Sequence, residues 1–390
     1  MSNAIVAGVD MVKFAKPGQQ EPYRVMASTA IQGALKDAGI EASAVQQAYG
    51  SYIYGDSTCA QHALYDAFMT GIPVINVNNN CSSGSTALFL ARQAVESGAA
   101  ECVLAFGFEE MQPGALSSHW DDRESPFDNF LDVLDKADYP AAPLALRCFG
   151  AAGHYYMEKY NASRDIFAKV SVKTRNHALN NPLSLFNTPL TEEQVLNDKV
   201  VFMDYLTRTM CCPPTCGAGA AIVCSEAFAK KHGIDGGVKI AAQAMATDTP
   251  QTWDNPIDLI GADMTRRAAK QVFEEASVDV SDVDVVELHD CFTTNEVVTY
   301  EGLGLCAEGE ASKFIADGDN TYGGKFVVNP SGGLMSKGHP IGATGLAQCY
   351  ELVNQLRGQA DQRQVAGAKL ALQHNLGLGG AVVVTLYQAS

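Results

Sequence analysis

The first 118 residues alternate short apolar runs with longer segments that have the apolar spacing of amphipathic helices. The apolar runs, which we expect to be strands, are AIVAGVD, QQAYGSYIYG, PVINVN and ECVLAFGFE. Helical spacing is found at 23–38 and 84–97. This alternation favours a mainly parallel sheet covered by helices, and therefore an α/β fold class.

The pattern changes at residue 119 and changes back at residue 200. Residues 119–199 are rich in aromatic side chains and helical spacing, and we interpret them as an inserted helical lid over an active site. A helical elaboration far from any chemistry is the alternative. Sheet-forming character returns at 200–230, which we assign with 1–118 to a first half. Residues 231–390 then form a second α/β half.

Two pairs of segments show that the halves resemble each other. GSTAL at 84–88 aligns with GATGL at 342–346, and DAGIEASAV at 37–45 aligns with EASVDVSDV at 275–283. Such internal similarity predicts a duplicated unit packed about a pseudo-two-fold axis, although matches this short could also arise by chance. The offset of the first pair (342 − 84 = 258) places Cys81 opposite His339, near the expected axis.

Cys81 has the surroundings of a nucleophile. It lies in VINVNNNCSSGSTALFLARQA, which reads as strand, tight turn and helix, with the thiol at the start of the helix. Free N–H groups and the helix dipole favour a thiolate there. A buried structural cysteine is the alternative. With His339 as a neighbouring base, the residue would form a nucleophile–base pair.

Three further segments carry candidate chemistry. VVELHDCFTTNE is a strand that ends in His289, Asp290 and Cys291, at the strand end where α/β sheets bind ligands. The alternative is that His289 and Asp290 only bond to each other and cap the next helix. NPSGGLMSKGHPIGATG has the glycines of tight turns but neither phosphate-binding spacing. LQHNLGLGG is a turn between apolar strands, and its N–H groups could point into a pocket.

Composition and charge exclude several classes of function. The 390 residues are 47% hydrophobic and 18% charged, as in an ordinary globular protein. No apolar run approaches the roughly 20 residues of a membrane span. The net charge of −17 argues against a nucleic-acid partner, but it leaves room for one compact anionic ligand. We expect a cytoplasmic protein, because neither a secretory signal nor a C-terminal peroxisomal tripeptide is present.

The cysteines argue against both disulfides and metal. Their number is odd, eleven, and their spacing follows no framework, which fits free thiols in a reducing compartment. The cluster of Cys211, Cys212 and Cys216 does not have the spacing of a zinc site. We therefore predict no bound metal.

Taken together, these motifs resemble the thiolase family, specifically its sterol carrier protein x type, over nearly the full chain. The markers are NNNCSSGSTALF, HDCF followed by TTNE, GDNTYGGKFVVNPSGG, GGLMSKGHPIGATG and QHNLGLGG. Most thiolases have Asn-Glu-Ala-Phe at positions 289–292 and a Cys-x-Gly at 374–376; the two replacements mark this subgroup, in which Cys291 takes the place of the late cysteine. CCPPTCGAG is a departure from the family pattern. The resemblance implies duplicated α/β halves in five αβαβα layers, with an inserted helical loop domain.

The resemblance also implies an activity, the thiolytic cleavage of a 3-ketoacyl-CoA in fatty-acid or sterol side-chain β-oxidation. Cys81 would attack, His339 would act as base, and Cys291 would protonate the departing acetyl-CoA or propionyl-CoA enolate. His289 and His339 would stabilise one oxyanion, and the N–H groups of Cys81 and Gly380 the other. The expected substrate contacts are Phe149, Phe292, Asn295, Ser331 and His374.

The partners implied by the resemblance are acyl-CoA and CoA, with coenzyme A as a substrate and no permanently bound cofactor. A homodimer or a dimer of dimers is expected. The reverse Claisen condensation is possible on the same site. Two alternatives stay open: a retro-aldol lyase of the thiolase superfamily that acts with a partner protein, and a non-catalytic acyl-CoA or lipid-binding protein.

Overall fold

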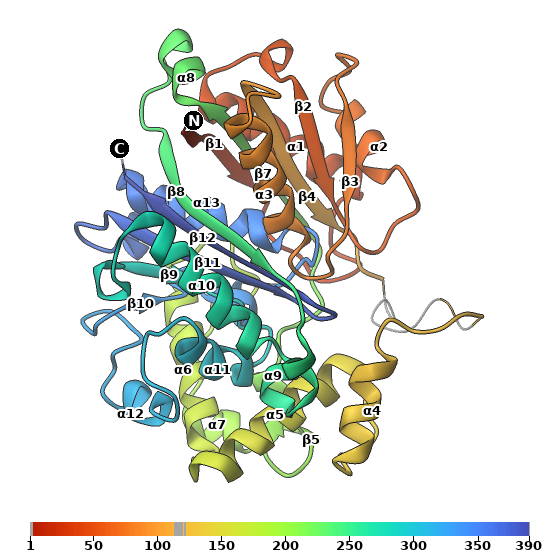
Figure 1. The fold of residues 1–390 in the computed structure, drawn as a ribbon, viewed down its shortest axis with the longest axis vertical. Coiled ribbons are helices and arrows are strands. Elements are labelled where there is room, and N and C mark those ends of the chain that lie inside the picture. Colours follow the sequence, from red (N-terminus) through yellow and green to blue (C-terminus); the bar gives the residue numbers. More distant parts are fainter. Residues whose placement is uncertain (1–2, 113–119, 121, 390) are drawn as a thin grey trace.

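The first half of the chain contributes five neighbouring strands to the sheet (Figure 1). The computed structural model describes residues 3–112, 120 and 122–389. The strands are β1 (Ala4–Met11), β2 (Gln47–Ser51), β3 (Val74–Val77), β4 (Cys102–Glu109) and β7 (Gly217–Ser225). They lie in the order β1-β7-β4-β2-β3, with β2 parallel to both of its neighbours. The four strands expected in residues 1–118 are thus confirmed.

The second half repeats this arrangement. Its strands are β8 (Val238–Ala246), β9 (Val285–Glu287), β10 (Val327–Val328), β11 (Leu370–Gly377) and β12 (Ala381–Gln388). Their order, β8-β12-β11-β9-β10, is the order of the first half when the strands are matched in sequence. Pairing of β1 with β8 joins the halves into one ten-stranded sheet. The duplicated α/β architecture is therefore confirmed.

Two helices lie between the halves. α3 (Ser83–Glu96) and α13 (Thr344–Arg357) contact each other and both halves of the sheet, and Leu88 and Leu346 belong to the same buried core. A Cβ on Gly345 would lie 2.2 Å from Ser85 Oγ and 2.3 Å from Ser85 N. The glycine therefore lets the N-terminal ends of the two helices approach closely, and these ends follow Cys81 and His339.

Other helices cover the outer faces and complete the five layers. The first half is covered by α1 (Tyr23–Ala38), α2 (Cys59–Tyr65) and α8 (Glu226–His232), and the second by α10 (Ala262–Ala276) and α11 (Thr293–Gly302). The remaining short elements are α12 (Ala311–Ala316), η1 (Ala42–Ala44), η2 (Arg208–Met210), η3 (Pro250–Trp253), η4 (Val280–Asp282), η5 (Gly333–Lys337) and η6 (Asp361–Arg363). Among the described residues, no helix has the length and apolar character needed to cross a bilayer.

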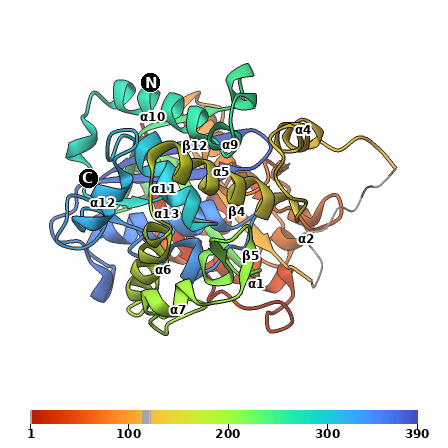
Figure 2. The same ribbon diagram turned by 90° about the horizontal axis from the view of Figure 1, so that it is seen from below.

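The predicted insertion, 119–199, is helical in its described part. It contains α4 (Asp128–Lys136), α5 (Leu144–Tyr160), α6 (Asp165–Ala178) and α7 (Glu192–Leu196), and a hairpin of β5 (Val200–Phe202) and β6 (Leu206–Thr207) follows. α5 and α6 pack on α11 of the second half, and α5 also packs on α9 (Pro256–Leu259) (Figure 2). Residues 119 and 121, where the insertion begins, lie outside the described part.

Candidate active site

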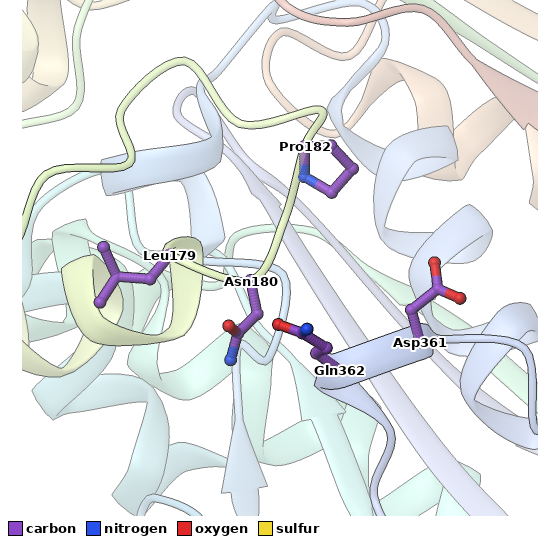
Figure 3. Close-up of a pocket in the computed structure, with 5 residues that line it drawn as sticks. All are labelled: Leu179, Asn180, Pro182, Asp361 and Gln362. Atoms are coloured by element: carbon purple, nitrogen blue, oxygen red, sulfur yellow. The ribbon is translucent and has the colours of Figure 1, made fainter.

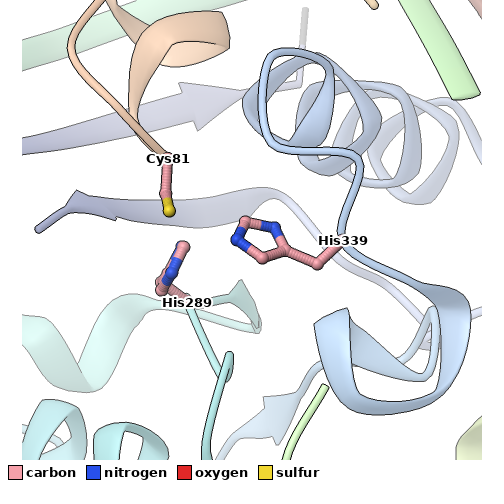
Figure 4. A group of neighbouring side chains, drawn as sticks. All are labelled: Cys81, His289 and His339. Carbon is pink, nitrogen blue, oxygen red and sulfur yellow. The ribbon is translucent and has the colours of Figure 1, made fainter. Parts of the chain in front are cut away.

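Side chains from three separate segments converge at the centre of the molecule (Figure 4). Cys81 precedes α3, His289 follows β9, and His339 precedes α13. One candidate ligand atom from each residue lies within 4.8 Å of those of the other two. The rings of His289 and His339 meet edge to face, with centroids 5.0 Å apart. The structure thus brings the predicted nucleophile and the predicted base together from opposite halves.

The turn before α3 is fixed by its own polar side chains. Asn80 adopts a left-handed conformation (φ 49°), and its side-chain amide donates to the carbonyl of Leu378 at 2.9 Å. The hydroxyls of Ser82 and Ser83 donate to the carbonyls of Asn79 and Asn80. Asparagine and serine suit such a turn because their short side chains bond to nearby main chain. Cys81 is therefore held half-buried at the start of the helix.

Hydrogen bonds fix the proton on His339. Its Nδ1 lies 2.7 Å from the hydroxyl oxygen of Thr344, and that hydroxyl donates to the carbonyl of Pro340 at 3.0 Å. The threonine oxygen must then accept, so Nδ1 carries the proton. Nε2 is buried and has no protein partner among the described residues. Burial lowers the pKa of His339 to about 3. The neutral ring therefore presents a free lone pair, as a general base requires.

A longer chain of hydrogen bonds fixes the opposite tautomer on His289. Tyr387 donates to Gln373 Oε1 at 2.6 Å, and Gln373 Nε2 donates to the Ser85 hydroxyl at 2.8 Å. Ser85 in turn donates to Asn375 Oδ1 at 2.8 Å. The amide nitrogen of Asn375 then donates to His289 Nδ1 at 2.9 Å, which leaves the proton on Nε2. His289 is therefore placed as a hydrogen-bond donor.

These tautomers disfavour a metal ion, although a thiol and two imidazoles resemble a ligand set. Metal ligation by His289 at Nε2 would require a lone pair there. Its proton would have to move to Nδ1, which faces the donating amide of Asn375. A metal could bind through Nε2 only if the hydrogen-bond chain from Tyr387 were reversed. The arrangement of donors thus supports the expectation that no metal is bound.

The thiol of Cys81 is neutral at rest, which corrects the expectation of a helix-stabilised thiolate. Burial raises its pKa to about 12, and the nearby carboxyl of Glu109 raises it further. The main-chain N–H groups of Leu378 and of Cys81 itself lower the pKa, but they do not outweigh burial. Desolvation exceeds the helix-end effect here because the thiol lies between the two packed halves. Deprotonation must therefore accompany reaction with substrate.

Cys291 belongs to the same cluster. Its side chain is 4% exposed, and its thiol interacts electrostatically with that of Cys81. Burial raises its pKa well above the ordinary cysteine value, so it carries its proton at neutral pH. The neighbouring carboxylate of Asp290 accepts the N–H groups of Leu334 (2.7 Å) and Met335 (3.4 Å) in η5. The alternative that Asp290 simply pairs with His289 is therefore wrong.

Two predicted aromatic contacts adjoin Cys291. Phe292 is stacked on Phe149, with ring centroids 4.8 Å apart and planes at 17°. Phe149 comes from α5, so the insertion contributes an apolar side chain beside the catalytic segment. Their contact with an acyl chain stays a prediction.

Three of the predicted substrate contacts support the main chain instead. Asn295 donates its amide to the carbonyl of His289. His374 accepts the N–H of His289 at Nδ1 (3.4 Å), and its Nε2 bonds to the Thr265 hydroxyl at 3.0 Å. Ser331 donates its hydroxyl to Glu287 at 2.8 Å. All three side chains are buried and already engaged, so we reassign them from substrate contact to positioning.

The predicted oxyanion donor Gly380 also needs correction. The main-chain N–H that bonds to the sulfur of Cys81 belongs to Leu378, two residues earlier in the same turn. Leu378 is in turn fixed through its carbonyl by Asn80. The sequence identified the turn correctly, but backbone direction within a glycine-rich turn is not readable from residue types.

A surface cavity of about 610 Å³ lies elsewhere (Figure 3). Its lining residues are Leu179, Asn180, Pro182, Asp361 and Gln362. They come from the loop after α6 and from η6, and none is a predicted site residue. The convergence of side chains, and not this surface cavity, identifies the candidate site.

Comparison with known proteins gives a consistent result. Residues 4–227 match the family model of the thiolase N-terminal domain, and residues 245–387 match that of the thiolase C-terminal domain-like family. The chain is 53% identical over 395 residues to sterol carrier protein 2 of Oryctolagus cuniculus, covering all of this chain and 72% of that protein. It is 36% identical to the benzoylsuccinyl-CoA thiolase subunit BbsB of Thauera aromatica, over 96% and 94% of the two chains. A solved structure titled Ltp2-ChsH2(DUF35) aldolase matches with a TM-score of 0.84 at 24% identity, over 99% and 98% of the chains.

Alkylation of Cys81 should show the pKa that burial imposes. Because the pKa is about 12, the thiolate fraction should rise about tenfold for each pH unit between pH 7 and pH 10. We expect the rate of iodoacetamide labelling at Cys81, followed by peptide mass spectrometry, to rise without a plateau over this range. A plateau below pH 8 would show that the resting enzyme already holds a thiolate.

Proposed function

Because the chain belongs to the thiolase family, whose acyltransferases act on CoA thioesters, we propose that it cleaves 3-ketoacyl-CoA by thiolysis. The products are acetyl-CoA, or propionyl-CoA if the substrate carries a 2-methyl group, and a shortened acyl-CoA. The observation that carries the proposal is the placement of Cys81 and His339 in the same 4.8 Å cluster, with Nε2 of His339 free to take a proton.

The first half-reaction transfers an acyl group to the enzyme. Nε2 of His339 takes the proton of Cys81 as the sulfur attacks the 3-keto carbon, so charge separates only when the carbonyl oxygen can share it. The C2–C3 bond then breaks, and Cys291 gives its proton to C2 of the departing enolate. Two neutral buried thiols suit these roles, because one must lose a proton on demand and the other must hold one.

The histidines also supply one oxyanion site. His289 offers Nε2–H, and His339 offers the same group once it is protonated. Both would donate to the thioester oxygen of the substrate as negative charge develops on it during C2–C3 cleavage. A second site for the tetrahedral oxygen at the attacked carbon is formed by the N–H groups of Cys81 and Leu378, which already point towards the sulfur.

The second half-reaction regenerates the enzyme. The thiolate of Cys291 takes the proton of an incoming CoA thiol, whose sulfur attacks the acyl group on Cys81. The shortened acyl-CoA leaves as Cys81 recovers its proton from His339. The same steps in reverse give Claisen condensation.

Of the alternatives, the retro-aldol lyase has one specific observation in its favour. The structure titled as an aldolase has a TM-score of 0.84, although at 24% identity this shows only a shared fold. An aldol cleavage needs neither an acyl-accepting thiol nor CoA as acceptor. The clustering of Cys81 and Cys291 with a free base favours thiolysis. It also argues against a non-catalytic lipid binder.

We further propose β-oxidation of fatty acids or sterol side chains in the cytoplasm, by a homodimer or a dimer of dimers. β3 is the last strand of the sheet, and Ile75 in its middle is 39% exposed. An exposed edge strand favours pairing with another chain.

Acyl transfer to Cys81 is the direct test of the proposed class. Incubation with acetyl-CoA or a 3-ketoacyl-CoA, without free CoA, should add the mass of one acyl group at Cys81. The Cys81→Ala variant should gain none, whereas Cys211→Ala should be acylated like the wild type. Absence of any acyl adduct on the wild type, with CoA-dependent cleavage also absent, would contradict thiolysis.

Removal of the His289 side chain should slow turnover while the fold is preserved. A preorganised donor of this kind contributes about 3 kcal/mol, so His289→Ala should lower kcat by about a hundredfold or more. Thiolysis kinetics over straight-chain, 2-methyl and steroid-side-chain substrates would measure this effect and identify the substrate class. His232→Ala, at the exposed end of α8, is the control. A near-normal rate for His289→Ala would refute the donor role.

A further inference from the structure

A short segment, 211–215, runs between two of the catalytic segments. Cys211 forms an isolated antiparallel bridge with Phe292, and Pro214 forms a parallel bridge with His339. The hydroxyl of Thr215 accepts the N–H of His339 at 3.0 Å. This segment belongs to the CCPPTCGAG stretch that departs from the family pattern, and the reaction proposed above assigns it no role.

The bridge sets Cys212 directly opposite Cys291. In an antiparallel pair, one step forward on one strand matches one step back on the other, so the 211–292 bridge places 212 against 291. The N–H of Cys212 donates to the carbonyl of Cys291 at 2.8 Å, which confirms this register. Directly opposed residues have Cα atoms roughly 4.5–5.5 Å apart and side chains on the same face. Disulfides need a Cα separation of roughly 4.4–6.8 Å.

The side chains are consistent with this pairing. Successive side chains of an extended strand point to opposite faces, and the thiol of Cys211 lies 3.5 Å from the carbonyl of Thr207. The thiols of Cys212 and Cys291 instead interact electrostatically with each other. Cys212 is half-buried, whereas Cys291 is 4% exposed. A small solute therefore reaches Cys212 first.

We propose that Cys212 and Cys291 form a reversible disulfide when the enzyme meets hydrogen peroxide. The thiolate of Cys212 attacks one peroxide oxygen, which gives a sulfenic acid and hydroxide. The thiolate of Cys291 then attacks the sulfenic sulfur, the S–S bond forms, and hydroxide leaves. With the two thiol protons, the products are one disulfide and two waters; the two sulfurs together lose two electrons, and the peroxide gains them.

The bond acts as a switch on the enzyme. It consumes the thiol that protonates the enolate, so turnover stops while Cys81 stays reduced; this consequence rests on the function proposed above. Burial raises the pKa of both Cys212 and Cys291, so bond formation is slow near neutral pH and accelerates as pH rises. A dithiol restores both thiols and the activity.

The test exposes the full-length protein to hydrogen peroxide at pH 8.5 and follows both the covalent bond and thiolysis. Non-reducing peptide mass spectrometry should find a 212–291 cross-link with a loss of two hydrogens. Activity should fall at least about tenfold, because a general acid is lost, and dithiothreitol should restore it. Cys212→Ser should keep most of its activity under the same exposure, with Cys212→Ala as a second variant.

Cys211→Ser is the matched control, because the neighbouring thiol faces away; it should form the cross-link and lose activity like the wild type. The competing partner is Cys81, whose thiol also interacts with both Cys212 and Cys291. A cross-link through Cys81, or equal inactivation of Cys212→Ser and wild type, would overturn the proposal. Since the cross-link is read by mass, its formation can be judged even if the protein shows no thiolysis.

Discussion

The site depends on the positions of two protons on two buried imidazoles. His289 and His339 lie edge to face in a space closed to water, where either could be donor or acceptor. Thr344 assigns the proton of one ring to Nδ1, and Asn375 assigns that of the other to Nε2. One ring is therefore a base and the other a donor before any substrate arrives. Opposite roles could not be maintained if either hydrogen bond were lost, because burial leaves no solvent to replace it.

Burial gives this arrangement a second property, which is neutrality at rest. Cys81 and Cys291 keep their protons, and both histidines stay uncharged. A buried ion pair is costly to create, so the proton moves from Cys81 to His339 only when a substrate oxygen takes up the developing charge. The duplicated fold explains how such a site arises. The N-terminal ends of α3 and α13 approach each other at Gly345, which places a nucleophile from one half beside a base from the other.

The sequence was sufficient for the architecture because hydrophobic periodicity and internal repetition are local signals. The 258-residue offset between the GSTAL and GATGL segments predicted that Cys81 and His339 would meet. It was not sufficient for the functions of Asn295, Ser331 and His374, because a polar residue beside a motif can face either the substrate or the main chain. The thiolate expected at Cys81 was wrong for a related reason: desolvation depends on packing between distant segments. Asn375 and Thr344 were missed as positioning residues, although both lie inside motifs that the sequence singled out.

The most direct measurement is nitrogen NMR of the protein labelled with ¹⁵N at its histidine side chains, at pH 7 and without ligand, with His289 and His339 assigned by single substitution. Long-range proton–nitrogen correlations distinguish the two neutral tautomers and the imidazolium. The account predicts a proton on Nδ1 of His339 and on Nε2 of His289, with both rings neutral. The same tautomer on both rings, or a charged His339, would contradict it.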